Sequence, residues 1–212
     1  MKIAIIGAGN VGGALGANWA QKGHDVVFGV RDAKAEKTQS LLRSIGGKAS
    51  AASPAEAAAS ADAIVLSTPW PATEAAIRSM GDLKGKIILD ATNPLAHGPD
   101  GISLDIGHSI SGGEKVQSWA AGASVYKALN TTGFANMANP VFDGAKSVMF
   151  VAGDDEANKP KVLKLVGDLG FEVVDAGGLR IARLLEPHAM LWIHLALVRG
   201  LGRDWAFGLL KH

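Results

Sequence analysis

Short apolar runs alternate with amphipathic segments along most of the chain, a pattern that predicts strands alternating with helices. The first run, residues 3–6, has no polar interruption, as expected for a strand buried on both faces of a parallel sheet. The predicted strands of this part are residues 3–6, 26–30, 48–51, 63–67, 86–89 and 124–129. The first predicted helices are residues 14–21, 35–44 and 53–61. This alternation predicts an α/β fold, a Rossmann-type doubly wound parallel sheet.

The pattern changes near Pro140. Residues 147–152 and 171–175 are strand-like, residues 156–169 are helical, and residues 179–210 are predicted to be helical with a break or a fresh start at Glu186-Pro187. We therefore expect a Rossmann domain, residues 1–139, and a small C-terminal domain with a helical tail, residues 140–212. Residues 94–113 are predicted to be a long loop, with order only around residues 102–106.

A glycine-rich segment, Gly7-Ala8-Gly9-Asn10-Val11-Gly12, joins the first strand to the first helix. In the G-x-G-x-x-G pattern the first glycine permits the tight turn, the second lets the backbone approach a pyrophosphate, and the third lets helix and strand pack closely. The phosphates then lie at the helix N-terminus. Because the glycines follow a predicted strand within a βαβ-sized unit, the segment predicts a dinucleotide-binding site.

The end of the second strand distinguishes the two pyridine nucleotides. An Asp or Glu there binds the ribose 2′-hydroxyl of NAD, whereas an Arg accommodates the 2′-phosphate of NADP. Gly29 stands where the acid is expected, Val30-Arg31 follows it, and Lys34 or Lys37 adds positive charge. The sequence therefore favours NADP(H).

Asp32 is the rival to this interpretation, because it lies about 20 residues after Gly12, the spacing of an NAD-binding carboxylate. We discount it because it follows the arginine and is suited to cap a helix starting near Ala33.

Three further strands end in polar or proline-containing turns. In open α/β sheets the ligand lies beyond the carboxyl ends of the strands, so these turns are expected to converge on the nicotinamide end of the cofactor. The turns are Thr68-Pro69-Trp70, Asn93-Pro94 and Asn130-Thr131-Thr132.

Composition narrows the function classes. The net charge of +1, without a run of basic residues, argues against a nucleic-acid surface. The absence of cysteine excludes disulfides and thiolate chemistry and fits a reducing cytoplasm. The longest apolar stretch, residues 189–198, is shorter than the roughly 20 residues that span a bilayer, and the early first strand leaves no room for a signal peptide. We expect a soluble cytoplasmic protein without a membrane span or a metal site.

Four segments together resemble the NADP-dependent oxidoreductases that use the deazaflavin coenzyme F420, over essentially the whole chain. They are the Gly7 to Gly12 segment with Arg31, the Thr68-Pro69-Trp70 turn, the segment Lys127-Ala128-Leu129-Asn130-Thr131-Thr132-Gly133-Phe134-Ala135-Asn136-Met137, and Arg183-Leu184-Leu185-Glu186-Pro187. The chain is also similar to the cytoplasmic NADPH-binding domains of membrane ferric reductases. The resemblance implies hydride transfer between NADPH and a dissociable acceptor, F420 or a flavin, held between the two domains.

Stacked rings need proximity and exclusion of water more than a side-chain acid or base, so no catalytic residue is assigned. The resemblance implies that Asn93, Asn130, Thr131, Thr132 and the backbone around Pro69 and Pro94 fix the nicotinamide. Trp70 and the loop carrying His97 and His108 would then cover the acceptor.

Other functions remain open at this point. A flavin or ferric reductase would use the same nucleotide site, and a non-catalytic NADPH sensor would use it without turnover. The spacing Lys127-x-x-Asn130 suggests a β-hydroxyacid dehydrogenase, but Lys127 lies in a strand-like run and the chain lacks a long helical substrate domain.

The helical tail is expected to be buried. Its apolar stripe is Leu184, Leu185, Leu191, Trp192 and Leu195. Because residues 189–198 are apolar on nearly all sides, this helix is expected to pack between layers or between subunits, and a homodimer is predicted.

Overall fold

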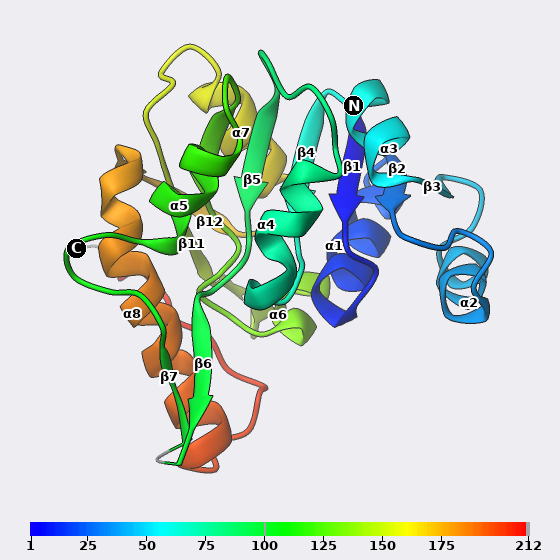
Figure 1. Cartoon of the computed structure of the whole chain (residues 1–212). Helices are drawn as coiled ribbons and strands as arrows, with labels where there is room; N and C mark the ends of the chain where they lie inside the picture. The colour runs from blue at the N-terminus through cyan, green and yellow to red at the C-terminus, as the bar shows by residue number, and fades with distance from the viewer. Residues whose placement is uncertain (100, 211–212) are drawn as a thin grey trace.

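Six parallel strands form most of one eight-stranded sheet in the computed structural model, which describes residues 1–99 and 101–210 (Figure 1). These strands are β1 (Lys2–Ile6), β2 (Asp25–Gly29), β3 (Ala49–Ala52), β4 (Ala63–Leu66), β5 (Ile87–Asp90) and β8 (Ser124–Lys127). Their spatial order is β3-β2-β1-β4-β5-β8, the order of a doubly wound dinucleotide-binding sheet. The predicted fold class is confirmed, with strand limits shifted by one or two residues.

Helices cover both faces of this sheet. They are α1 (Asn10–Gln21), α2 (Glu36–Ile45), α3 (Pro54–Ser60), α4 (Trp70–Arg78), α5 (Gly112–Trp119), α6 (Phe134–Ala138), α7 (Lys159–Gly167) and α8 (Ala182–Ile193). Alternate residues of a strand point to opposite faces, so Ile3 and Ile5 pack against α1 and its neighbours, whereas Ala4 and Ile6 pack in the core beneath α3 and α4. Burial on both faces explains the uninterrupted apolar run of the first strand.

Two further strands continue the same sheet beyond β8. They are β11 (Val148–Gly153), which is antiparallel to β8, and β12 (Glu172–Gly177), which is parallel to β11. Residues 140–210 therefore share a sheet with the first part of the chain, and residues 211–212 of the expected second domain lie outside the described residues. The division at residues 139 and 140 stays a prediction.

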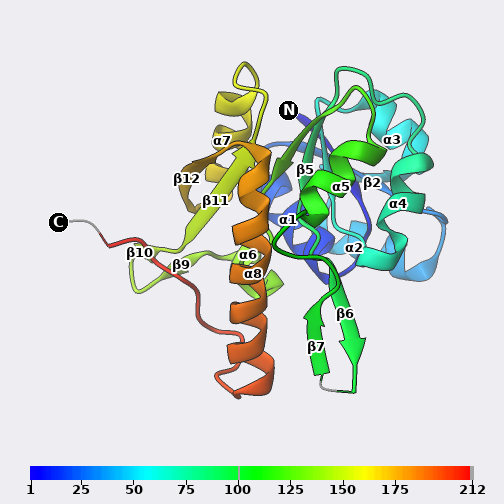
Figure 2. The ribbon, with the colours of Figure 1, turned by 60° about the vertical axis from the view of Figure 1, so that its left-hand side comes forward.

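The segment expected to be a loop contains an antiparallel hairpin, β6 (Leu95–Gly98) with β7 (Gly101–Leu104). The expectation of order only around residues 102–106 was therefore wrong. The strands are short and half-exposed, so they lack the apolar signal of core strands. Figures 1 and 2 show that the hairpin and the lower half of α8 both project beyond the carboxyl ends of the parallel strands. A smaller hairpin joins β9 (Val141–Phe142) to β10 (Ala145–Lys146).

The predicted break at Pro187 was wrong, because Pro187 lies inside α8. A proline inside a helix costs about 3 kcal/mol, and burial of the residues around it offsets this cost. Leu185, Ala189 and Trp192 are each at most 5% exposed.

The helix also ends earlier than expected. After a 3-10 turn at Leu179–Ile181 and α8, a π-helical turn, His194–Val198, is the last helical segment of the described residues. Gly200 and Gly202 have positive φ angles of 76° and 74°, and the Gly202 amide donates to the Ala196 carbonyl, as at a glycine-capped helix end. Residues 203–210 then form an irregular tail.

By length and composition, Leu179–Val198 is the one helical run of the described chain that could cross a membrane. In this structure its inner face packs on the protein. Leu185 and Trp192 point inward, whereas Leu184 and Leu191 are 66% and 49% exposed. The predicted stripe is thus divided between core and surface.

Candidate functional site

The glycine-rich turn after β1 is held against the turn after β4. Gly7 has a φ of 111°, which favours glycine, and the Ser67 hydroxyl donates to the carbonyls of Ile6 and Gly7 at 3.2 and 3.0 Å. A Cβ on Gly12 would lie 2.1 Å from the Gly7 carbonyl oxygen, so only glycine fits there. A Cβ on Gly9 would meet nothing within 4 Å. The turn therefore packs tightly on one side and is open on the other.

The open side faces the N-terminus of α1. The cap residue is Gly9, which has no capping side chain, and the amides of Asn10, Val11 and Gly12 occupy the first turn, where amides have no partner within the helix. A cavity of about 330 Å³ lies here and is lined by Ala8, Gly9, Asn10, Gly13, Ala14, Lys37, Leu41 and Phe134. A cavity of about 390 Å³ lies at the other end of α4, away from the strand ends. Free amides and open space fit a pyrophosphate at the first cavity.

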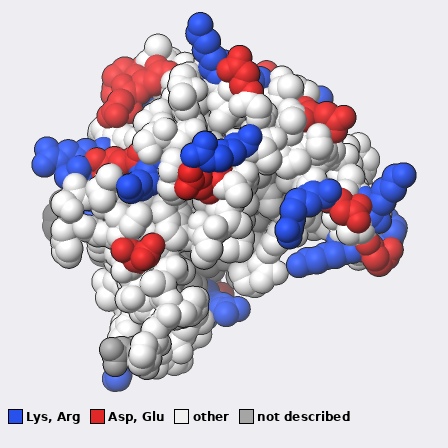
Figure 3. Space-filling view, in the orientation of Figure 1, with Lys and Arg blue, Asp and Glu red and all other residues white. Residues whose placement is uncertain are grey.

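Positive side chains surround the end of β2. The half-buried Val30 donates its amide to Ala52, and Arg31, Lys34 and Lys37 are exposed. Throughout residues 1–99 and 101–210 these three cations form no ion pair. Figure 3 shows charged side chains gathered around α2, while the surface of the hairpin is largely uncharged. Arg31 is thus free to bind a phosphate group.

Asp32 is engaged in the turn itself. Its Oδ1 accepts hydrogen bonds from the amides of Lys34 and Ala35 at 2.8 and 3.2 Å. The helix begins at Glu36 rather than near Ala33, so Asp32 caps the turn before the helix. Its carboxylate is used locally, which supports the preference for NADP(H) over NAD.

The turn after β4 supports the hairpin. Thr68 and Thr73 hydroxyls lie 3.0 Å apart, and exposed Pro69 is the cap residue of α4. The half-buried Trp70 ring contacts Trp119, with centroids 5.4 Å apart, and its Nε1 donates to Asp105 at 3.3 Å. Trp70 therefore holds the base of the hairpin, and its predicted contact with an acceptor stays a prediction.

The turns after β5 and β8 are joined by two asparagines. Asn93 Nδ2 donates to the Asn130 carbonyl at 2.9 Å, and Asn130 Nδ2 donates to Asn93 Oδ1 and to the Leu185 carbonyl at 3.1 and 3.2 Å. Carbonyl partners fix both amide orientations. Asn130 is 4% exposed, and its Oδ1 has no hydrogen-bond partner among residues 1–99 and 101–210. A buried unpaired acceptor is unusual, and it marks this turn as a candidate functional position.

The two threonines of the turn after β8 are buried and contact other residues of the protein. Thr131 is buried with its hydroxyl 3.6 Å from the Met149 sulfur, and the Thr132 hydroxyl accepts from Asn136 Nδ2 at 2.8 Å. The buried Leu129 has a φ of 62°, a strained conformation for a non-glycine residue. Such strain clusters at functional sites, so it adds support to a site at this turn. Pro94 is buried, so a ligand at this turn would meet the backbone around Pro94 rather than its ring.

Lys127 is fully buried, and its Nζ lies 2.9 Å from both Asp90 Oδ2 and Glu186 Oε1. Burial alone would lower the pKa of Lys127, but the charges and hydrogen bonds of Asp90 and Glu186 together raise it above its usual range. A lysine held charged in this way is a poor proton donor to a substrate. This observation argues against the β-hydroxyacid dehydrogenase interpretation.

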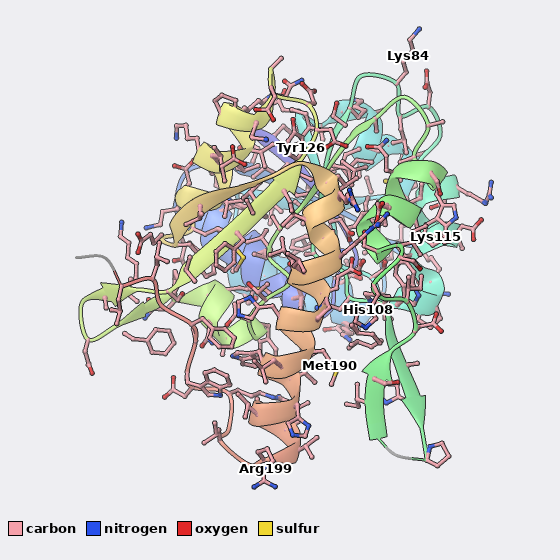
Figure 4. The ribbon with its side chains drawn as sticks, turned by 90° about the vertical axis from the view of Figure 1, so that its left-hand side faces the viewer. Lys84, His108, Lys115, Tyr126, Met190 and Arg199 are labelled. Carbon is pink, nitrogen blue, oxygen red and sulfur yellow. The ribbon has the colours of Figure 1, made fainter. Side chains whose placement is uncertain are left out.

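The histidines of the expected acceptor loop are exposed. His97 lies in β6, paired with Ile102 of β7, and His108 lies in the segment before α5 with a φ of 59°. Figure 4 shows His108 and Met190 on the side of α8 that faces the hairpin. The predicted role of these histidines in acceptor use stays a prediction.

Some residues around the site were missed from the sequence. Phe134 lines the cavity at Gly9, and the tail residue Trp205 accepts at its carbonyl from Asn136 and from Trp192 Nε1. Phe134 could have been found, because it follows Gly133 directly after a strand-end turn. The Trp205 contact could not, because an irregular tail carries no periodic signal.

A bidentate ion pair docks α8 on α5. Arg183 donates to Glu114 Oε2 and Oε1 at 2.8 and 2.6 Å. These hydrogen bonds, ahead of a smaller opposing effect of burial, lower the pKa of Glu114 from 4.5 to about 2. Because the folded pKa is depressed, the stabilisation is complete above the unfolded value and is lost as pH falls towards about 2.

We expect Glu114→Gln to lower the free energy of unfolding at pH 7, with a difference from the wild type that shrinks between pH 5 and pH 3. Denaturant titrations at several pH values measure it. Glu74→Gln, in the exposed pair with Arg78, is the control with a smaller effect. A difference that is constant with pH would contradict the role of the Glu114 charge.

Comparisons with known proteins agree with the family that the sequence resembles. Residues 2–94 match the family described as "NADP oxidoreductase coenzyme F420-dependent". The chain is 31% identical to an F420-dependent NADP reductase of Methanothermobacter thermautotrophicus, over 92% of this chain and 89% of the relative. It is 28% identical to the enzyme of the same name from Methanothermobacter marburgensis, over 92% of both chains.

A solved structure resembles the whole molecule. A protein from Arthrobacter sp. FB24, proposed to be an F420-dependent NADP reductase, superposes with a TM-score of 0.89 and 32% identity, covering 100% of both chains. The resemblance inferred from the sequence is confirmed. The chain therefore belongs to the family of F420-dependent NADP reductases.

Proposed function

We propose that this protein catalyses hydride transfer between NADP(H) and coenzyme F420. The observation that carries the proposal is the 31% identity to an F420-dependent NADP reductase over 92% of the chain. The unpaired Arg31 beside the glycine-rich turn agrees with it, because a guanidinium can bind a phosphate with two parallel hydrogen bonds.

The residues present fit the nucleotide. Gly9 leaves room for the pyrophosphate against the first turn of α1, and Arg31 with Lys34 would bind the 2′-phosphate. Asn130 would act through its hydrogen bonds to Asn93, because its own Oδ1 is enclosed by protein atoms. When bound, NADP(H) supplies or accepts the hydride. Thr68, Pro69, Asn93, Pro94 and Thr132 would complete the wall around the ring.

The acceptor would lie beyond the strand ends, between the hairpin and the lower half of α8. Both elements project on that side of the sheet (Figure 2), and the face of this region that Figure 3 shows carries few charged side chains. Orientation and exclusion of water can supply about 7–11 kcal/mol of a barrier without a side-chain acid or base. The protein's own task is thus to hold two rings in contact and to release the acceptor afterwards.

Stopped-flow oxidation of NADPH tests the proposal, with F420, FMN, FAD and a ferric chelate as parallel acceptors. We expect rapid turnover with F420 and at least about tenfold slower turnover with the others. Faster turnover with a flavin or a ferric chelate would replace the proposed acceptor. NADPH binding without turnover of any acceptor would instead indicate a sensor.

We also propose that the enzyme is a cytoplasmic homodimer. Leu184 and Leu191 are exposed seven residues apart on α8, and Val198 is exposed at the end of the π-helical turn. This spacing suits packing against the same helix of a second copy. Trp192 is unsuited to test the interface, because it is buried within the chain.

Leu191→Glu is expected to convert the dimer into monomers without unfolding them, because Leu191 is exposed in the single chain. Light scattering coupled to gel filtration measures the mass. Val141→Glu, a similar change at an exposed valine of β9, is the control and should leave the mass unchanged. A wild type that is monomeric, or a Leu191→Glu variant with the wild-type mass, would reject the interface.

A further inference from the structure

A buried charge network lies directly behind the proposed nicotinamide site. Lys127 Nζ donates to Asp90 Oδ2 and the Thr92 carbonyl at 2.9 and 2.6 Å, and it forms an ion pair with Glu186 Oε1 at 2.9 Å. Asp90 Oδ1 accepts from the Thr92 amide and hydroxyl at 3.0 and 2.6 Å. Asp90, Lys127 and Glu186 are at most 1% exposed. The Lys127 ammonium group is therefore enclosed by two carboxylates and a carbonyl.

Glu186 brings a second helix into the network. Its Oε2 and Oε1 accept from the amides of Gly112 and Gly113, the first two residues of α5, at 2.8 and 2.9 Å. A Cβ on Gly112 would lie 3.1 Å from Glu186 Oε1, so glycine permits this close approach. The Glu186 carboxylate therefore faces two backbone amides and the Lys127 ammonium group. The network thus joins β5, β8, α5 and α8 at one buried point.

The same elements carry the two asparagines. Asn93 directly follows Thr92. The Thr92 carbonyl accepts from Lys127, and the Thr92 hydroxyl donates to Asp90. Asn130 lies three residues after Lys127 and donates to the carbonyl of Leu185, the neighbour of Glu186. The bond between Asn93 and Asn130 therefore spans two turns that are both anchored to the network.

A buried ion network of this kind is weak support for stability, because the cost of removing charges from water offsets much of their attraction. The network instead fixes the relative positions of its elements, because its hydrogen bonds and ion pairs form only in this arrangement. We infer that Asp90, Lys127 and Glu186 are positioning residues, which fix the Asn93 and Asn130 turns at the distance that hydride transfer requires. This inference rests on the proposed function for its kinetic part only.

Glu186→Gln tests the inference, because one amide nitrogen must then face a donor while Asp90 and Lys127 stay paired. We expect kcat with F420 to fall about 10- to 100-fold, as for a reacting group misplaced by an ångström, with an NADPH Kd within about threefold of the wild type. The primary isotope effect of deuterated NADPH should increase as chemistry becomes slower. Glu114→Gln is the matched control, since it removes a charge from the same contact of α5 with α8 but has no bond to either turn.

A readout that needs no acceptor separates this inference from the proposed function. Hydrogen exchange of the amides at residues 91–93 and 129–132 should become at least about fivefold faster in Glu186→Gln and should be unchanged in Glu114→Gln. Unchanged exchange together with unchanged kcat would overturn the positioning role. A wild type that does not reduce F420 would overturn the proposed function, while the exchange result would still decide the positioning role.

Thr92→Val is a second variant, in case Glu186→Gln does not fold. It keeps all three charges and removes only the hydroxyl that Asp90 holds. We expect kcat to fall and exchange to become faster, as in Glu186→Gln but to a smaller extent. Thr92→Ser should restore both. A Thr92→Val enzyme with wild-type kcat and exchange would count against the network.

Discussion

Arg31→Ala is expected to raise the NADPH dissociation constant by roughly 10- to 150-fold. Hydrogen bonds to charged groups contribute about 1.5–3 kcal/mol, and this range converts directly into that change in affinity. Arg31 is exposed and has no acidic partner in the part of the chain that the structure describes, so its charge is available to the 2′-phosphate. Fluorescence titration at low ionic strength measures the binding, because salt screens an exposed contact.

NADH is the control for this experiment. It lacks the 2′-phosphate, so Arg31→Ala should leave its affinity nearly unchanged. Lys34→Ala should weaken NADPH binding by only about fivefold or less, as expected for an exposed single-point ion pair. Equal losses for both nucleotides would show that Arg31 supports the fold. A wild type that prefers NADH would show that Asp32 binds the ribose despite its hydrogen bonds to Lys34 and Ala35.

Local spacing predicted the nucleotide site because its parts follow one another in the chain. Gly7, Gly9 and Gly12 lie within one turn, and the structure shows the tight turn and the close packing that the motif requires at Gly7 and Gly12. Gly29 ends the adjacent strand, and Arg31 follows two residues later. The strand ends after β4, β5 and β8 were placed within two residues for the same reason.

The charge network could not be predicted in this way. Lys127 was placed in its strand, but its partner Asp90 lies 37 residues earlier and Glu186 lies in the tail. A lysine is rarely fully buried unless it is paired, and a sequence without a tertiary arrangement does not show the pair.

The sequence also did not predict which face of α8 packs against the protein. The apolar stretch 189–198 has no preferred inner face in the sequence, and contacts with distant residues determine it, among them Trp192 on Gly133 and Arg183 with Glu114. The earlier helix end, in contrast, had a signal in Gly200 and Gly202.

Gly12→Ala is expected to damage both the fold and the nucleotide site. The new Cβ would lie 2.1 Å from the Gly7 carbonyl oxygen and 2.6 Å from Ser67 Oγ. The hydroxyl can rotate away, but the Gly7 oxygen belongs to a backbone turn with a φ of 111° and cannot move alone. Overpacking of this kind costs about 1–3 kcal/mol, which lowers Tm by roughly 2–12 °C in a chain of this size. NADPH affinity should fall at least about tenfold, because the shifted turn holds the amides that face the phosphates.

Gly9→Ala separates binding from folding. Gly9 has extended dihedral angles, φ −83° and ψ −166°, and its Cβ would meet nothing within 4 Å, so the fold should accept alanine with a Tm within about 2 °C of the wild type. The methyl group would occupy the space through which a pyrophosphate approaches the backbone, so NADPH affinity should still fall about tenfold or more. Thermal unfolding and nucleotide titration of both variants give the result. If Gly9→Ala bound NADPH as tightly as the wild type, the phosphates would not lie on this turn, and the cavity beside Phe134 would need another occupant.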